Sequence, residues 1–116
     1  MSHPLPDAIV ELIAHRFAVL AEPMRIKMLD HLREREEASV LEIAHVLGAS
    51  HANVSRHLNV LHRAGIVGRR KSGTKVMYRI DDPSVFRLCE EVCGGLAERH
   101  RELGALLDPQ SEEAAA

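Results

Sequence analysis

Apolar residues recur at helical spacing in the first third of the chain. This periodicity predicts one helix from Asp7 to about Leu20 and a second from Pro23 to about Arg35, since proline is tolerated in the first turn of a helix. The apolar positions of the first helix are Ile9, Leu12, Ile13, Phe17 and Leu20. We expect residues 1–6 to form a flexible lead.

Two shorter helical segments follow and are separated by a tight turn. Ser39 is placed to cap a helix that ends at Leu47, and Ser50 is placed to cap another that ends at Gly65. Residues 48–50, Gly-Ala-Ser, join the two segments. Two short helices joined in this way are the helix-turn-helix arrangement, which the sequence therefore predicts here.

The pattern changes from helical to alternating in residues 66–80. Apolar and polar residues alternate on both sides of residues 72–73 (Ser-Gly), which predicts a β-hairpin. Residues 82–83 (Asp-Pro) then favour a helix start, with aspartate as the cap and proline in the first position. This fifth helix is expected to run to about Leu107. We expect residues 94–95, both glycine, to interrupt it, because each glycine costs about 1 kcal/mol relative to alanine.

The order of elements predicts a mainly α fold with a small β-hairpin, namely a winged helix-turn-helix of five helices plus one wing. A chain of 116 residues suits one domain, over residues 7–107, followed by a frayed tail at residues 108–116. A domain of this size buries only a modest core, and the first and fifth helices carry more apolar surface than it can bury. We therefore expect a homodimer that forms through these two helices. The apolar positions of the fifth helix are Val85, Leu88, Val92, Leu96 and Leu103.

Charge is distributed unevenly along the chain. The formal net charge is −2, yet residues 43–80 contain seven basic residues and no aspartate or glutamate. The rest of the chain holds eight basic and 17 acidic residues. A basic block in an acidic chain is typical of a surface that binds a polyanion, with a merely solvated basic face as the alternative. Together with the helix-turn-helix, this block predicts double-stranded DNA as the partner.

The second helix of the helix-turn-helix and the hairpin supply the candidate DNA contacts. The first turn of such a recognition helix reaches base edges in the major groove, and a basic wing reaches phosphates or the minor groove. The expected contacts are Ser50, His51, Asn53, Ser55, Arg56, His57, Arg69, Arg70, Lys71, Lys75 and Arg79. His57 has two further interpretations, as a hydrogen-bonded residue that steadies the helix and as a metal ligand.

Other classes of function are less consistent with the sequence. The chain has two cysteines, Cys89 and Cys93, which are too few for a disulfide framework. Their spacing also differs from the Cys-x-x-Cys of a redox enzyme. We see no nucleophile–base arrangement or glycine-rich phosphate loop, so we do not expect an enzyme. We expect no signal peptide and no contact with a membrane, which places the protein in the cytoplasm with reduced thiols. A winged helix that binds a partner protein instead of DNA is the remaining alternative.

Three tracts carry a resemblance to a known family. They are residues 20–29 (LAEPMRIKML), residues 55–67 (SRHLNVLHRAGIV) and residues 78–79 (Tyr-Arg). Together they resemble the ArsR/SmtB family of bacterial repressors, and the similarity covers roughly residues 8–105. The resemblance implies a winged-helix homodimer whose first and last helices form the interface. It also implies repression of transcription that a metal or a chemical effector releases.

The positions at which that family binds metals are altered here. The paired cysteines of the third helix would fall on Ser39 and Leu41. The zinc ligands of the fifth helix would fall on Asp82, Ser84, Gly95 and Glu98. Both imidazoles of the second site are lost, and carboxylates alone suit zinc poorly.

Cys89, Cys93 and His100 are the candidate sensing residues if an effector acts on this chain. At about 100° per residue the three share one helix face, within roughly 40° of one another. Thiolate and imidazole suit nickel or zinc, and paired thiols suit arsenite or an oxidant. The alternatives are cysteines that only pack the dimer interface and a regulator with no effector of its own. We expect no required cofactor, and we expect the DNA partner of the dimer to be a pseudo-palindromic operator.

Overall fold

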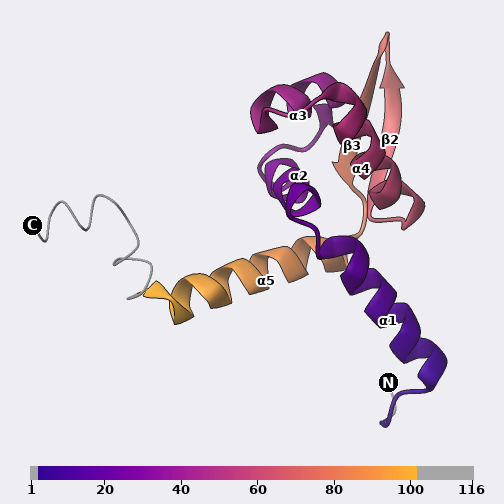
Figure 1. Ribbon diagram of the computed structural model, residues 1–116, viewed down its shortest axis with the longest axis vertical. Coiled ribbons are helices and arrows are strands. Elements are labelled where there is room, and N and C mark those ends of the chain that lie inside the picture. The colour runs from indigo at the N-terminus through magenta and orange to yellow at the C-terminus, as the bar shows by residue number, and fades with distance from the viewer. Residues whose placement is uncertain (1–2, 102–116) are drawn as a thin grey trace, which may run out of the picture. The chain divides into compact units, whose positions relative to one another are not determined.

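The computed structural model describes residues 3–101 (Figure 1). By their contacts these residues form two compact units, residues 3–83 and residues 84–101. The first unit contains α1 (Asp7–Leu20), α2 (Pro23–Glu34), β1 (Ala38–Ser39), α3 (Val40–Leu47), α4 (His51–Arg63), β2 (Val67–Ser72) and β3 (Lys75–Ile80). The second unit contains the rest of α5 (Pro83–Arg99), because Pro83, the first residue of this helix, is the last residue of the first unit. Over the described residues this order confirms the expected winged helix-turn-helix with five helices.

Local side chains set the bounds of the helix-turn-helix. Ser39 Oγ accepts a hydrogen bond from the Glu42 amide at 3.1 Å, and Ser50 Oγ accepts one from the Asn53 amide at 3.1 Å. Both caps were predicted, and each satisfies an amide that the first helical turn leaves without a partner. Gly48 ends α3 with φ 62°, a left-handed conformation that glycine adopts without steric cost.

Gly65 is a second position at which the backbone requires glycine. It follows α4 with φ 73°, and a Cβ added there would meet nothing within 4 Å. The cost of Gly65→Ala is therefore backbone strain alone, and we expect it to lower the free energy of unfolding by about 1–2 kcal/mol. Urea denaturation measures this change.

Gly94→Ala is the matched control for this substitution. Gly94 lies inside α5, and a Cβ there also meets nothing within 4 Å. Because alanine is the better helix former by about 1 kcal/mol, we expect Gly94→Ala to raise stability or leave it unchanged. Two substitutions that both lower stability would contradict the assignment of strain to Gly65.

The three strands form an antiparallel sheet in the order β1-β3-β2. β2 pairs with β3 over its whole length, as the hairpin prediction required. β1 was not predicted: it has two residues, and it pairs through Ala38 opposite Tyr78 and Ser39 opposite Met77. The segment before α3 is thereby joined to the wing, while the hairpin extends past α4 (Figure 1).

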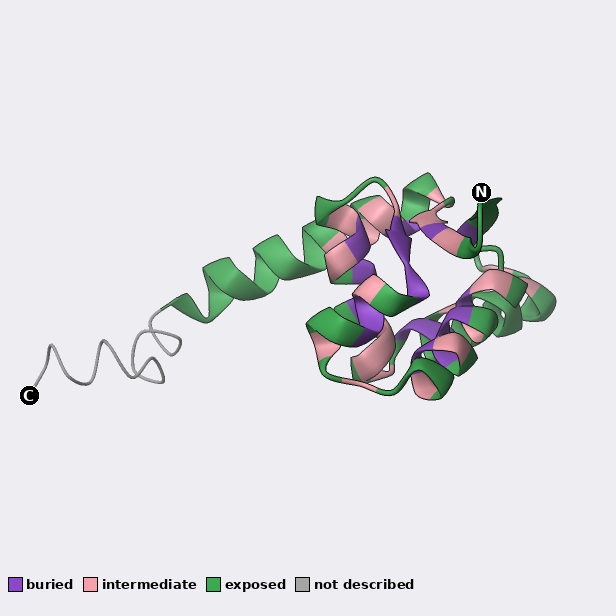
Figure 2. Cartoon of the chain, turned by 90° about the horizontal axis from the view of Figure 1, so that it is seen from above, coloured by how far each residue is buried: buried purple, intermediate pink, exposed green. Residues whose placement is uncertain are grey.

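The core of the first unit lies between α2, α3, α4 and the base of the hairpin. Buried positions on these elements face inward in Figure 2. The largest fully buried side chains are Met28, Leu29, Ile43, Val54, Leu58, Leu61, Ile66 and Val67. Each fully buried aliphatic side chain contributes about 1.5–3 kcal/mol. This packing fixes the orientation of α4 and so determines which of its residues remain exposed.

α1 combines a polar anchor with an exposed apolar surface. Arg16 donates a hydrogen bond to the Ala64 carbonyl at the end of α4 and forms an ion pair with Asp82. Leu12 and Phe17 remain 66% and 53% exposed, respectively. The apolar stripe predicted for this helix is therefore largely uncovered within one chain.

α5 differs from its prediction in one respect. The helix continues through Gly94 and Gly95 without interruption, because the cost of glycine in a helix is modest and does not forbid helical geometry. Residues from Glu90 to Arg101 are exposed (Figure 2). The expected continuation of the helix to Leu107, with Leu103, and the tail at residues 108–116 lie outside the described residues.

Candidate nucleic-acid interface

The first two turns of α4 present a group of polar side chains. His51 and Arg56 are exposed, and Asn53 and Ser55 are half-buried. One guanidinium nitrogen of Arg56 donates to Asn53 Oδ1 at 2.7 Å. This contact uses one of the five donor hydrogens of the arginine. It therefore orients the side chain and leaves the other donors available for DNA.

His57 differs from the other candidate contacts on α4 because it is buried. Its Nδ1 accepts a hydrogen bond from Arg25 Nε at 3.2 Å and lies 3.7 Å from a carboxylate oxygen of Glu22. The contact with Arg25 of α2 places His57 to steady α4 against that helix, and its expected contact with DNA stays a prediction.

One face of the wing is turned toward α4. Side chains alternate between the faces of a strand, and Arg69 lies opposite the buried Tyr78 in the sheet register. The Arg69 guanidinium lies 3.5 Å from Asn59 Oδ1 on α4 and 3.5 Å from the Tyr78 hydroxyl. Lys71 follows on the same face and is exposed. Asn59, which the sequence did not indicate, thus lies next to a wing arginine.

The opposite face of the wing carries Arg70 and Arg79, and each has a carboxylate partner. Arg70 donates two hydrogen bonds to Glu37, from Nε at 2.7 Å and from a terminal nitrogen at 2.6 Å. Arg79 Nε lies 3.5 Å from Asp81, and a Cβ on Gly68 would lie 2.8 Å from the Arg79 guanidinium. Of the seven basic residues, Arg70 and Arg79 therefore have a carboxylate partner, which residue type alone does not reveal.

The pairing also shifts the titration of both groups. The hydrogen bonds from Arg70 lower the pKa of the Glu37 carboxyl below its ordinary value. The same hydrogen bonds raise the pKa of Arg70. Charge-assisted bidentate pairs of this kind are stronger than neutral hydrogen bonds. Glu37 therefore stays ionised in the neutral range, and it was not among the residues that the sequence indicated.

Comparison with known proteins identifies the family. Residues 20–70 match a family model described as a helix-turn-helix domain. The transcriptional regulator KmtR of Mycobacterium tuberculosis is 36% identical over 110 residues, which cover 89% of this chain and 84% of KmtR. This chain belongs to the ArsR/SmtB family of helix-turn-helix transcriptional regulators. The ArsR/SmtB family consists of DNA-binding regulators, and the chain is not an enzyme.

Two solved structures resemble this ArsR/SmtB chain closely. The antimony-specific transcriptional repressor AntR superposes with a TM-score of 0.79 at 26% identity, covering 86% of this chain and 90% of AntR. The homodimeric winged helix-turn-helix domain of a possible ArsR-family regulator from Mycobacterium bovis superposes with a TM-score of 0.72 at 31% identity. That match covers 87% of this chain and 94% of the relative.

Asp82 and Glu98 are the two carboxylates that this ArsR/SmtB chain retains at the positions of the family's zinc ligands, and both have arginine partners. Asp82 forms an ion pair with Arg16, and Glu98 forms one with Arg101. Within residues 3–101, no group of three or more His, Cys, Asp or Glu side chains is placed to hold a metal ion.

The candidate sensing residues lie on or next to α5. Cys89 is half-buried, Cys93 is exposed, and neither is in a disulfide. His100 is exposed and follows the last residue of the helix. The two cysteines are four residues apart on a continuous helix, so they lie on one face, as predicted.

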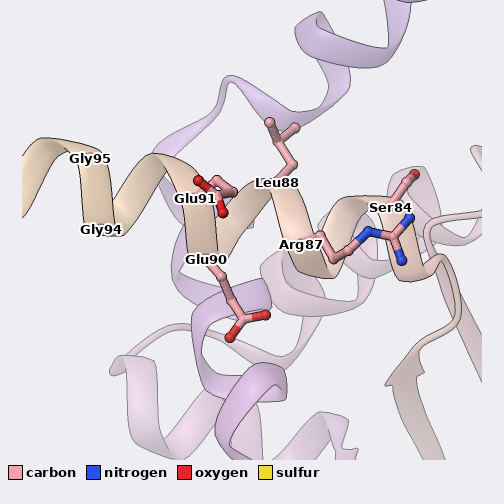
Figure 3. A pocket seen from close by; sticks show the side chains of 7 residues that line it. All are labelled: Ser84, Arg87, Leu88, Glu90, Glu91, Gly94 and Gly95. Atoms are coloured by element: carbon pink, nitrogen blue, oxygen red, sulfur yellow. The ribbon is translucent and has the colours of Figure 1, made fainter.

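A shallow hollow runs along the same helix (Figure 3). Its lining residues are Ser84, Arg87, Leu88, Glu90, Glu91, Gly94 and Gly95. All of them belong to α5, and Leu88 and Glu90 point to different sides of the helix. The hollow is therefore open helix surface, with neither candidate cysteine in its lining.

In the described part of the chain, no helix is long and apolar enough to cross a membrane.

Proposed function

We propose that this ArsR/SmtB regulator is a homodimeric repressor that binds a pseudo-palindromic operator and is released by an effector. The observation that carries the proposal is the exposed start of α4, where Asn53 orients Arg56 within a segment that contains no acidic residue. Because operator DNA lies in the cytoplasm of a bacterial cell, the proposal places the protein there.

The recognition helix supplies the sequence-reading contacts in this proposal. The major groove of B-DNA admits one α-helix, and the first turns of that helix reach base edges. The residues we assign to this role are Ser50, His51, Asn53, Ser55 and Arg56. Their support is a position that is exposed or half-buried at the start of a helix whose other face is packed in the core.

The wing supplies phosphate contacts in this proposal. Lys71 and Lys75 are exposed, and Arg69 is exposed on the face that lies toward α4. Phosphate contacts fix the register of a protein on the duplex but carry no sequence information. The division of roles is therefore recognition by α4 and positioning by the wing. Arg79 lies 3.5 Å from the Asp81 carboxylate, so it has a competing acidic partner within the fold.

A two-fold dimer presents two recognition helices to one duplex, which matches two half-sites of a pseudo-palindrome. The support for a dimer is the apolar surface that α1 and α5 each expose, together with the homodimeric relative. On α5, Val92 and Leu96 are 50% and 52% exposed. Surfaces of this kind are typical of a protein–protein interface.

The DNA-binding proposal is tested by affinity and its salt dependence. Fluorescence anisotropy compares an operator selected from a randomised duplex pool with a random-sequence duplex of the same length. We expect tight, sequence-dependent binding that weakens steeply with salt. In a plot of the logarithm of affinity against the logarithm of salt concentration, each phosphate contact should add about 0.9 to the magnitude of the slope. Binding that is weak and insensitive to salt would favour the alternative of a winged helix that binds a partner protein.

For the effector we propose a thiol-reactive agent or a soft metal ion that binds Cys89 and Cys93. Paired thiols on one helix face suit such species, and AntR is a relative described as antimony-specific. Nickel or zinc is the second candidate, and it requires ligands such as His100 from both protomers, because one chain offers no group of three within the described residues. No cofactor is needed for DNA binding in this proposal.

Substitution of both cysteines tests this sensing role. Antimonite, zinc, nickel and hydrogen peroxide are added separately to the complex of protein and operator. We expect the thiol-reactive agents to release wild-type protein and to leave the Cys89→Ser/Cys93→Ser variant bound. His100→Ala, the control on the same helix, is expected to affect release by nickel or zinc only. Equal release of wild type and the double variant would make the cysteines structural.

A further inference from the structure

One basic side chain of the wing is held by an acidic residue from another part of the fold. Glu37 lies just before β1, and Arg70 lies in β2, so the pair reaches across β3, which separates these strands in the sheet. In the sheet register Arg70 lies opposite Met77, which in turn lies opposite Ser39. Their side chains meet on the face of the wing that carries Arg79, opposite the face of Tyr78.

The geometry of this pair differs from that of the other wing cations. Glu37 accepts from Arg70 through both carboxylate oxygens, at 2.7 and 2.6 Å. The Glu37 side chain is 25% exposed and that of Arg70 is 53% exposed, so both remain accessible to solvent. The lowered pKa of Glu37 agrees with an ionised partner at neutral pH. Arg70 is therefore electrically neutralised although it lies within the basic segment.

We propose that Glu37 withholds Arg70 from the DNA backbone and so sets the strength of the electrostatic attraction between the wing and DNA. The inference rests on the proposed role of the wing in phosphate binding. A phosphate offers arginine the same two-oxygen acceptor geometry as a carboxylate, so the two compete for one guanidinium. If Arg70 left Glu37 for a phosphate, the negative charge of Glu37 would be unpaired beside the DNA. Repulsion between this carboxylate and the DNA therefore opposes the exchange.

The consequence is one phosphate contact fewer for each protomer than the basic residues of the wing would otherwise make. Contacts to phosphate act on every sequence alike, because they carry no base information. Glu37 therefore limits overall affinity and its dependence on salt, while the preference for the operator over other DNA is left to α4.

Salt titration of five variants tests this inference. The log–log dependence of affinity on salt is measured with a random-sequence duplex and with the selected operator. We expect Glu37→Gln to free Arg70 and to steepen the slope by about 0.9 for each protomer. Its affinity at low salt should rise by the same factor for both duplexes. In the Glu37→Gln/Arg70→Gln variant the slope should return to the wild-type value.

Three single variants complete the set. Glu36→Gln removes the same charge from the neighbouring position, which is exposed, and should leave the slope unchanged. Arg70→Gln in the wild-type background should also leave the slope unchanged, whereas Lys71→Gln should make it shallower by about 0.9 for each protomer. The Arg70→Gln and Lys71→Gln pair tests the inference without any change at Glu37.

The outcomes separate this inference from the proposed function. A slope that is unchanged or shallower in Glu37→Gln overturns the inference, because the pair would then only shape the wing. A slope that becomes shallower in Arg70→Gln also overturns it, because Arg70 would then contact DNA in the wild type. Absence of salt-dependent binding in the wild type overturns the proposed function itself.

Discussion

Substitution of Phe17 by aspartate is expected to convert the proposed dimer into a monomer. Phe17 is 53% exposed on α1, in a stripe that includes the more exposed Leu12. Burial of a phenylalanine side chain contributes about 1.5–3 kcal/mol, and two-fold symmetry places two copies in one interface. Because about half of the side chain is already covered within one chain, the two copies together account for a loss of about 1.5–3 kcal/mol, which weakens dimerisation by roughly 10- to 150-fold. The cost of burying the new carboxylate adds to this effect.

Sedimentation velocity at micromolar protein measures this change, with Leu41→Asp as the matched control. Leu41 is 61% exposed on α3, outside the two helices assigned to the interface. It lies in the first turn of that helix, where an added acidic group is favourable, so the fold tolerates the change. Wild-type and Leu41→Asp proteins should sediment as dimers and Phe17→Asp as a monomer. A dimer of unchanged stability in Phe17→Asp would place the interface elsewhere.

The fold was largely predictable because its boundaries are set by neighbouring residues. Ser39 and Ser50 cap helices through amides three residues further along the chain, and Gly48 ends α3 through its own backbone conformation. Signals of this kind are visible in a single sequence. β1 was missed because Ala38 pairs with Tyr78, forty positions away, and two residues carry no alternating pattern.

The candidate site was predictable in its composition but not in its pairing. The basic segment and the exposed start of α4 follow from residue types and helix period. Which cations are available depends on partners distant in sequence: Glu37 and Arg70 are 33 positions apart, and Arg25 and His57 are 32 apart. Only the register of the sheet and the packing of α2 on α4 bring these groups together.

Removal of the Arg56 side chain is expected to reduce operator affinity more than affinity for random DNA. Arg56 is exposed on α4, and its contact with Asn53 Oδ1 at 2.7 Å holds the guanidinium near the exposed start of the helix. Arginine bound through two hydrogen bonds to guanine discriminates against the wrong base by about 1–3 kcal/mol. Arg56→Ala should therefore weaken operator binding by roughly 5- to 150-fold.

Arg63→Ala is the matched control because Arg63 lies two turns further along α4, where the helix ends, and is also exposed. It removes the same charge away from the turns that reach bases, so its effect on operator and random duplexes should be equal and small. Asn53→Ala should reproduce part of the Arg56→Ala loss, because the arginine then lacks the amide oxygen that orients it. In the double variant the two losses should not add, as expected for residues that act through one contact. If Arg56→Ala weakened binding to operator and random DNA by the same factor, Arg56 would be a phosphate contact and another residue of the first turns of α4 would read the sequence.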